Sequence, residues 1–182
     1  QVTLDNMSHP LPEPFFVIAT QNPAQQLGTF PLPEAQLDRF LMSVHIDYPS
    51  KAAEQLLYRE GHKTTVLDKA IDFATVKYLQ NKVGDVTVSD AIVGYVHDLV
   101  SFSRHNDKFP AGLSPRAGLA LIEAAKAWAF LGGRDFVVPE DVQAVLSSVV
   151  RHRLQDQTTL GAALISDQGC IGQYLSDHVA VG

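Results

Sequence analysis

The chain of 182 residues has little of what marks secreted, membrane-spanning or nucleic-acid-binding proteins. Its one cysteine, Cys170, cannot form a bridge within the chain, so we expect a cytoplasmic protein. No apolar run approaches the roughly 18 residues of a membrane span, and we expect no span. The formal charge of -6 has the wrong sign for neutralising nucleic-acid phosphates, which disfavours a nucleic-acid partner.

Metal-binding patterns are scarce as well. The histidines form no H-x-x-x-H pair and have no cysteine partner close by, so we expect no metal ligands. Arg151, His152 and Arg153 form a small basic cluster, which we interpret as a solvated helix end that complements the helix dipole.

The residues that are present are typical of a globular protein, with 46% hydrophobic and 19% charged side chains. The pattern changes at Pro49-Ser50. Before this point strand-like apolar runs alternate with proline-rich turns, and after it apolar residues recur every three or four positions. The sequence therefore predicts a mainly α fold with a small α/β part, divided into residues 1–49 and residues 50–182.

The first part is expected to hold two strands joined through a loop and a short helical turn. Residues 15–20 form a continuous apolar run, typical of a strand covered on both faces. A helical turn over 34–40 precedes a second strand over 41–47. A short edge strand is expected within the first ten residues.

Start and stop signals predict six helices in the second part. The first helix begins after Ser50, the second spans 71–82 and ends before Gly84, and the third begins at 88–90. The fourth runs from Ser114-Pro115 to Gly132-Gly133, the fifth begins at 138–141, and the sixth is a short helix around 171–175. In the helix after Ser114 the buried side is expected to carry Leu119, Leu121, Ile122, Ala125 and Trp128.

Asn22 is the first candidate for chemistry. It follows the carboxyl end of the apolar run 15–20, the edge at which open α/β sheets collect their ligands. A neutral amide there can orient a water beside a phosphate without repelling it. The alternative is that Asn22-Pro23 only starts a turn.

Arg39 is the second candidate. Its neighbours Leu37 and Phe40 would pack inward, which leaves the guanidinium free to reach another subunit. The alternative is a surface arginine that pairs within its own helical turn with Glu34 or Asp38.

Arg116 is the third candidate. It lies in the first turn of the helix that Ser114 begins, where the positive end of the dipole favours anions and not cations. An anionic partner would offset this cost, and the alternative is a side chain that points into water.

Five segments taken together carry a more specific signal: ATQNP, GTFPLPEAQLDRF, LSPRAG, GGRDFVVPEDV and VVRHRL. In this order and at these spacings they resemble the MoxR family of AAA+ ATPases, over residues 1–154. The resemblance implies the carboxyl-terminal remnant of a P-loop α/β core followed by an all-α lid domain. It also implies a ring of like subunits, usually a hexamer, that binds ATP and Mg²⁺ between neighbours.

On that pattern Asn22 matches sensor 1, Arg39 matches the arginine finger, and Arg116 matches sensor 2 on the lid. The family's usual partner is a protein with a von Willebrand factor A domain. The resemblance implies that the family's role, and so that of this chain, is the chaperone-like maturation of protein complexes or metal insertion.

The departures from the pattern limit what this chain does by itself. It has no G-x-x-x-x-G-K-[ST] phosphate loop and no Asp-Glu pair for Mg²⁺. In the family both precede the region seen here, so we expect a piece of a longer subunit that neither binds ATP nor hydrolyses it alone. The exposed edges of strand 15–20 are then free to pair with a second copy. The alternative function is a helical adaptor that binds a partner protein and never meets nucleotide.

Overall fold

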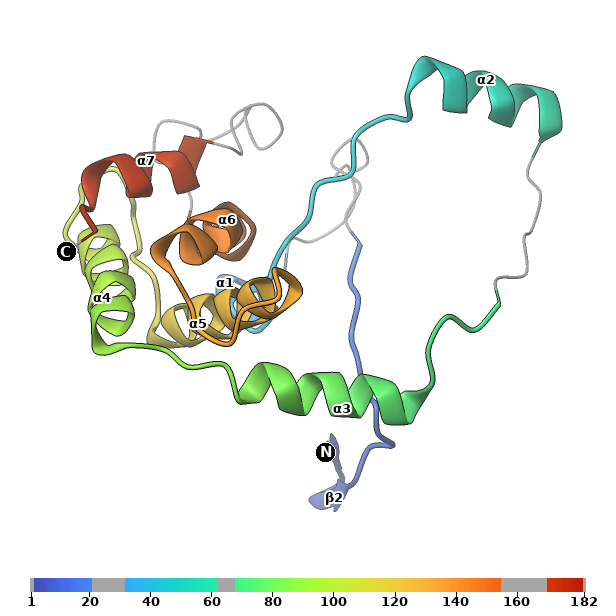
Figure 1. The fold of residues 1–182 in the computed structure, drawn as a ribbon, viewed down its shortest axis with the longest axis horizontal. Helices are drawn as coiled ribbons and strands as arrows, with labels where there is room; N and C mark the ends of the chain where they lie inside the picture. Colours follow the sequence, from blue (N-terminus) through green and yellow to red (C-terminus); the bar gives the residue numbers. More distant parts are fainter. Residues whose placement is uncertain (1, 21–31, 62–67, 155–169, 182) are drawn as a thin grey trace.

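The computed structural model describes residues 2–20, 32–61, 68–154 and 170–181 (Figure 1). The fold of this part is mainly helical with a small two-stranded sheet, as expected. The helices are α1 (Glu34–Leu37), α2 (Lys51–Glu60), α3 (Phe73–Gly84), α4 (Asp90–Arg104), α5 (Pro115–Leu131), α6 (Pro139–Val150) and α7 (Cys170–His178).

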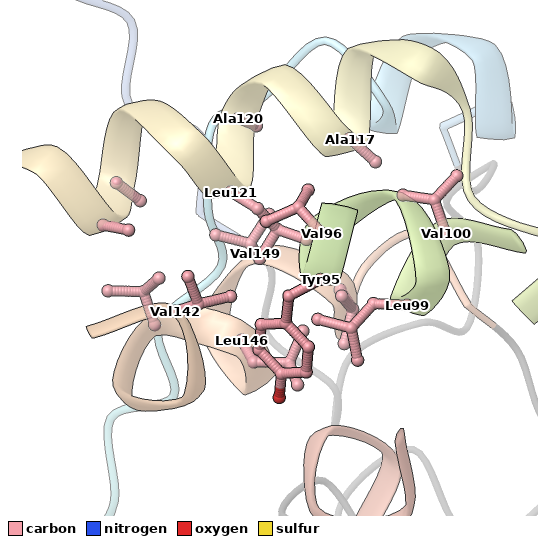
Figure 2. Close-up of a cluster of buried hydrophobic side chains, with 14 of the residues drawn as sticks. Tyr95, Val96, Leu99, Val100, Ala117, Ala120, Leu121, Val142, Leu146 and Val149 are labelled. Atoms are coloured by element: carbon pink, nitrogen blue, oxygen red, sulfur yellow. The ribbon is translucent and has the colours of Figure 1, made fainter. Parts of the chain in front are cut away.

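Helices α4 to α7 form the hydrophobic core. Figure 2 shows Leu99 of α4, Leu121 of α5 and Leu146 of α6 converging between the three helices. All three are fully buried, and Leu175 of α7 is buried as well. Each such side chain contributes about 1.5–3 kcal/mol through removal of its surface from water. Helix α2 lies apart from this group (Figure 1) and has no buried residue.

Serine N-caps begin three of the helices where the sequence predicts them. Ser50 Oγ accepts a hydrogen bond from Ala53 N–H at 3.4 Å, and Ser89 and Ser114 cap α4 and α5 in the same way. An N-cap of this kind contributes about 1 kcal/mol because it satisfies one of the free N–H groups at the helix start.

The two strands predicted over 15–20 and 41–47 are not present. Neither segment has regular secondary structure or a ladder partner, and their apolar side chains are largely exposed, with Phe16 at 81% and Ile46 at 87%. A central strand needs neighbours on both edges for its N–H and C=O groups, and the described residues provide none. The expectation of strands here is therefore wrong for this chain.

The strand expected near the start is one half of a hairpin. Strands β1 (Val2–Leu4) and β2 (Met7–His9) pair antiparallel, with Val2 opposite His9. Asp5 and Asn6 form the two-residue turn, and both have positive φ, as hairpin turns of the primed type require.

The buried face of α5 also differs from the prediction. Leu121 and Ala125 are buried as expected, but Leu119 is 66% and Trp128 50% exposed. The face toward α4 and α6 consists of small residues instead, namely Ala117, Ala120, Ala124, Ala125 and Ala129 around Leu121. Because α5 is apolar on most of its circumference, periodicity alone could not fix which side turns inward.

Helix α7 is longer than the predicted turn at 171–175. Gly172 lies so close to α6 that an added Cβ would come within 2.1 Å of Ser147 Oγ. At the other side of α7, Tyr174 accepts a hydrogen bond from Asn106 Nδ2 at 3.1 Å. In the part of the chain described, no helix combines the length and the apolar character needed to cross a bilayer.

Candidate functional site

The turn after α1 packs on the beginning of α5 and the end of α6. Ser43 N–H donates to Ser148 O at 2.8 Å, which ties this turn to the last residues of α6. Arg39 lies within the turn and is exposed, while Leu37 and Phe40 on either side are half-buried. The Arg39 side chain has no hydrogen-bond or ion-pair partner among residues whose positions are described. Pairing of Arg39 with Glu34 or Asp38 is thus not observed.

Asp38, next to Arg39, is the centre of a polar cluster. Ser114 Oγ lies 2.9 Å and 3.0 Å from the two carboxylate oxygens, Arg116 Nη1 lies 3.1 Å from Oδ2, and Arg153 Nε lies 3.0 Å from Oδ1. Burial raises the pKa of Asp38, but the hydrogen bonds from Ser114 and Arg153 and the charges of both arginines outweigh it. The pKa is therefore below its ordinary value, and Asp38 is an anion near neutral pH.

This carboxylate explains the unusual position of Arg116. A cation in the first turn of α5 is disfavoured by the helix dipole, and Asp38 supplies the anion that offsets the cost. Ser114 joins the two features, because its hydroxyl donates to Asp38 and accepts from Ala117 N–H at 3.2 Å. The start of α5 thus binds an acidic group of the same chain, and the Arg116 side chain is still 56% exposed.

Arg153 is the functional candidate that the sequence analysis missed. Its side chain is only 3% exposed, so the interpretation of this cluster as a solvated helix end is wrong for Arg153. Besides Asp38 Oδ1, it donates to Asp38 O at 3.1 Å, Phe40 O at 2.5 Å and Leu41 O at 3.1 Å, and to Val149 O. Burial lowers the pKa of Arg153 despite its pairing with Asp38. Its acceptors lie more than a hundred residues away for the most part, so no local pattern could reveal them.

His152 adds to the same contact. Its Nε2 lies 3.1 Å from Phe40 O, and since a carbonyl only accepts, the ring donates from this nitrogen. Burial and the charge of Arg153 lower the pKa of His152, against the opposing effects of Phe40 O and Asp38, so the neutral ring is favoured.

The hollow beside Asp38 is too small to be a complete ligand pocket. It has a volume of about 180 Å³ between α1, the start of α5 and the Arg153 side chain. Small-molecule pockets usually measure about 300–1,000 Å³. The hollow therefore does not enclose a nucleotide.

The three predicted site residues have different outcomes. Asn22 lies outside the described residues. Arg116 pairs with Asp38, whereas Arg39, the residue after Asp38, is exposed and pairs with no described residue, so the structure does not bring the two arginine side chains into contact. Within the described ranges no group of three His, Cys, Asp or Glu side chains is arranged to hold a metal ion.

Comparison with known proteins gives matches over both parts of the chain. Residues 1–42 match the family described as "ATPase family associated with various cellular activities (AAA)", and residues 101–167 match the AAA lid domain. The chain is 40% identical over 156 residues to "Uncharacterized protein YeaC" of Bacillus subtilis, covering 84% of this chain and 49% of YeaC. It is 37% identical over 163 residues to "Chaperone MoxR1" of Mycobacterium tuberculosis, and the match covers 84% of this chain and 43% of MoxR1.

A solved structure agrees with these matches. The crystal structure of a protein described as an ATPase, from Cytophaga hutchinsonii, superposes with a TM-score of 0.83 at 33% identity, covering 100% of this chain and 58% of the other. The chain spans about half the length of the curated relatives it matches.

Proposed function

The chain belongs to the MoxR family of AAA+ ATPases, and from this we propose that it supplies catalytic arginines to ATP sites shared between subunits of a ring. The observation that carries the proposal is the Asp38 cluster. In it the Asp38 carboxylate binds Arg116, which stays 56% exposed, and the next residue, Arg39, is exposed and pairs with no described residue. Arg39 is therefore available to an anionic ligand, and Arg116 could bind one in exchange for Asp38.

Arg39 is proposed to act on the ATP of a neighbouring subunit. Transfer of a γ-phosphoryl group to water develops negative charge on the equatorial oxygens. An arginine inserted from a neighbour accelerates this step by about 10³–10⁵, or about 4–7 kcal/mol. A planar guanidinium can bind two of these oxygens at once, whereas a lysine cannot.

Arg116 and Asn22 are proposed to act on the ATP held by their own subunit. Arg116 would exchange the Asp38 carboxylate for a phosphate oxygen, and movement of α5 would follow the nucleotide state. Asn22 would orient the attacking water through its neutral amide.

The full-length protein is expected to use ATP with Mg²⁺, as its family does. Among the described residues no group of three His, Cys, Asp or Glu side chains could hold this metal. We further propose that the 182-residue chain alone does not hydrolyse ATP.

The assembly and setting of the protein are also proposals. We propose a homo-oligomeric, hexameric ring in the cytoplasm, with residues 1–49 belonging to the ATPase core and 50–182 to the lid. A von Willebrand factor A domain protein is the proposed partner, and the chaperone-like maturation of protein complexes the proposed task. The name of the Mycobacterium tuberculosis relative, a chaperone, supports this task.

Steady-state ATP hydrolysis by the full-length protein tests the role of Arg39. Arg39→Ala should lower kcat by about 10³ or more while nucleotide still binds, and Arg39→Lys should recover little. Arg59→Ala, which removes an exposed arginine of α2, is the matched control and should keep normal turnover. Unchanged turnover in Arg39→Ala would refute the role of Arg39, and a full-length protein that binds no nucleotide would favour the adaptor function.

A further inference from the structure

One buried side chain holds the backbone on both sides of Arg39. Arg153 donates to the carbonyl oxygen of Asp38, which precedes Arg39, and to those of Phe40 and Leu41, which follow it. The distances are 3.1, 2.5 and 3.1 Å. The carbonyl groups around the exposed arginine are therefore fixed from within the fold.

Every N–H group of the Arg153 guanidinium is used in this contact. Nε donates once, to Asp38 Oδ1, and Nη1 and Nη2 donate twice each, to four carbonyl oxygens. A buried cation is costly unless its charge and its donors are satisfied. Here the planar fork has one carboxylate and four carbonyls as acceptors, and an ammonium group with three donors at a single point could not span them.

The same side chain connects the turn to both lid elements around it. Val149 O, one of its acceptors, belongs to α6, and Asp38 is bound in turn by Ser114 and Arg116 at the start of α5. His152 holds Phe40 O from the adjacent position. The turn that carries Arg39 is thereby hydrogen-bonded both to the start of α5 and to the end of α6.

We propose that Arg153 is a positioning residue for Arg39, and that through it the lid of one subunit sets the rate of hydrolysis in the neighbouring subunit. This inference rests on the proposed function of Arg39. Transition-state stabilisation depends steeply on placement, and a displacement of about 1 Å can cost about 100-fold in rate. Arg153 acts without touching nucleotide.

The kinetic consequence is a change in kcat alone. In the full-length protein Arg153→Gln should lower kcat by about 100-fold with KM for ATP nearly unchanged, because Arg39 contributes to the transition state and not to ground-state binding. Arg153→Lys keeps the buried charge but loses the fork, and should show a smaller loss of the same kind. Arg59→Gln is the surface control.

A mixed-subunit experiment separates positioning from simple destabilisation. Full-length Arg39→Ala subunits keep Arg116 and are called acceptors, and Arg116→Ala subunits keep Arg39 and are called donors. Mixing the two restores complete sites where an acceptor binds ATP beside a donor. Arg153→Gln or Arg153→Lys is then added to one kind of subunit at a time, and helicity and ring size are compared with those of the parent.

The expected result is asymmetric. In donors the Arg153 variants should reduce the recovered hydrolysis at least about tenfold, and in acceptors by less than about threefold, because Arg39 acts only from the donor side. Equal losses from both sides, or no loss from the donor side, would overturn the proposal. Failure of the unmodified mixture to recover any activity would instead refute the shared site, and hence the proposed function itself.

Discussion

Arg116 and Asp38 form an ion pair between α5 and the turn after α1, with 3.1 Å between Nη1 and Oδ2. The arginine proposed to bind a phosphate group already binds an anion of its own chain. Nucleotide and carboxylate would therefore compete for one guanidinium. Because the Asp38 carboxylate also binds Arg153, release of Arg116 changes the environment of the residue that holds the Arg39 backbone.

Ser114 has two roles in this pair, and its removal should cost more than the removal of an ordinary N-cap. Ser89→Ala should destabilise the 182-residue chain by about 1 kcal/mol through loss of the α4 cap. Ser114→Ala should cost about 1 kcal/mol more, since the hydrogen bond to Asp38 is also lost. Denaturant unfolding measures the loss of unfolding free energy in each variant. Equal losses in Ser89→Ala and Ser114→Ala would contradict the two roles of Ser114.

Gly172 should tolerate no side chain, because α7 packs against α6 at this point. An alanine Cβ would lie 2.9 Å from Ser147 Cα as well as against the hydroxyl, so α7 must move away. Gly172→Ala should destabilise the chain by about 1–3 kcal/mol. Gly94→Ala on α4, where nothing lies within 4 Å, is the control and should stabilise by up to about 1 kcal/mol. A stabilising Gly172→Ala would show that α7 does not pack as described.

Asp141 should give the folded chain part of its acid sensitivity. It is 1% exposed and accepts from both Nη atoms of Arg134 at 2.6 Å and from Val138 N–H at 2.9 Å. The Arg134 hydrogen bond lowers the pKa of Asp141 below the ordinary 3.8, against burial, which raises it. Its contribution is therefore complete above that value and is lost as the pH falls through the pKa of the folded state.

Asp141→Asn should accordingly destabilise the chain by about 2–3 kcal/mol at neutral pH and flatten the decline of unfolding free energy below pH 4. Asp135 is an exposed neighbour of this pair, and Asp135→Asn should change neither the stability at neutral pH nor the decline of unfolding free energy below pH 4. Urea unfolding between pH 7 and pH 2 provides the comparison, and an unaltered acid decline in Asp141→Asn would remove Asp141 from this account.

The sequence predicts those parts of the fold whose causes are local. Ser50, Ser89 and Ser114 begin helices because an N-cap needs only a side chain and the N–H groups two or three residues on. The expected strand at 15–20 is wrong since a strand depends on neighbours that the run itself does not specify. Trp128 is exposed because several faces of α5 are apolar enough to be buried.

In the candidate site, too, the sequence predicts what has a local cause and misses what depends on distant residues. A sequence motif identifies Arg39 and Arg116 as candidates, but the pairing of Arg116 with Asp38 is seen only in the fold. The position of Arg153 at a helix end predicts a solvated side chain, because basic residues at helix ends usually lie in water. Its burial follows from carbonyl acceptors in a turn 112 to 115 residues away, which no local pattern contains.

Sharing of the ATP site between subunits is tested most directly by ATP hydrolysis in mixtures of full-length Arg39→Ala and Arg116→Ala subunits. Each variant alone should be slower than the parent by about 10³, and the mixture should recover a substantial part of the parent rate because complete sites form between unlike neighbours. A mixture no faster than the sum of its two components would contradict the account.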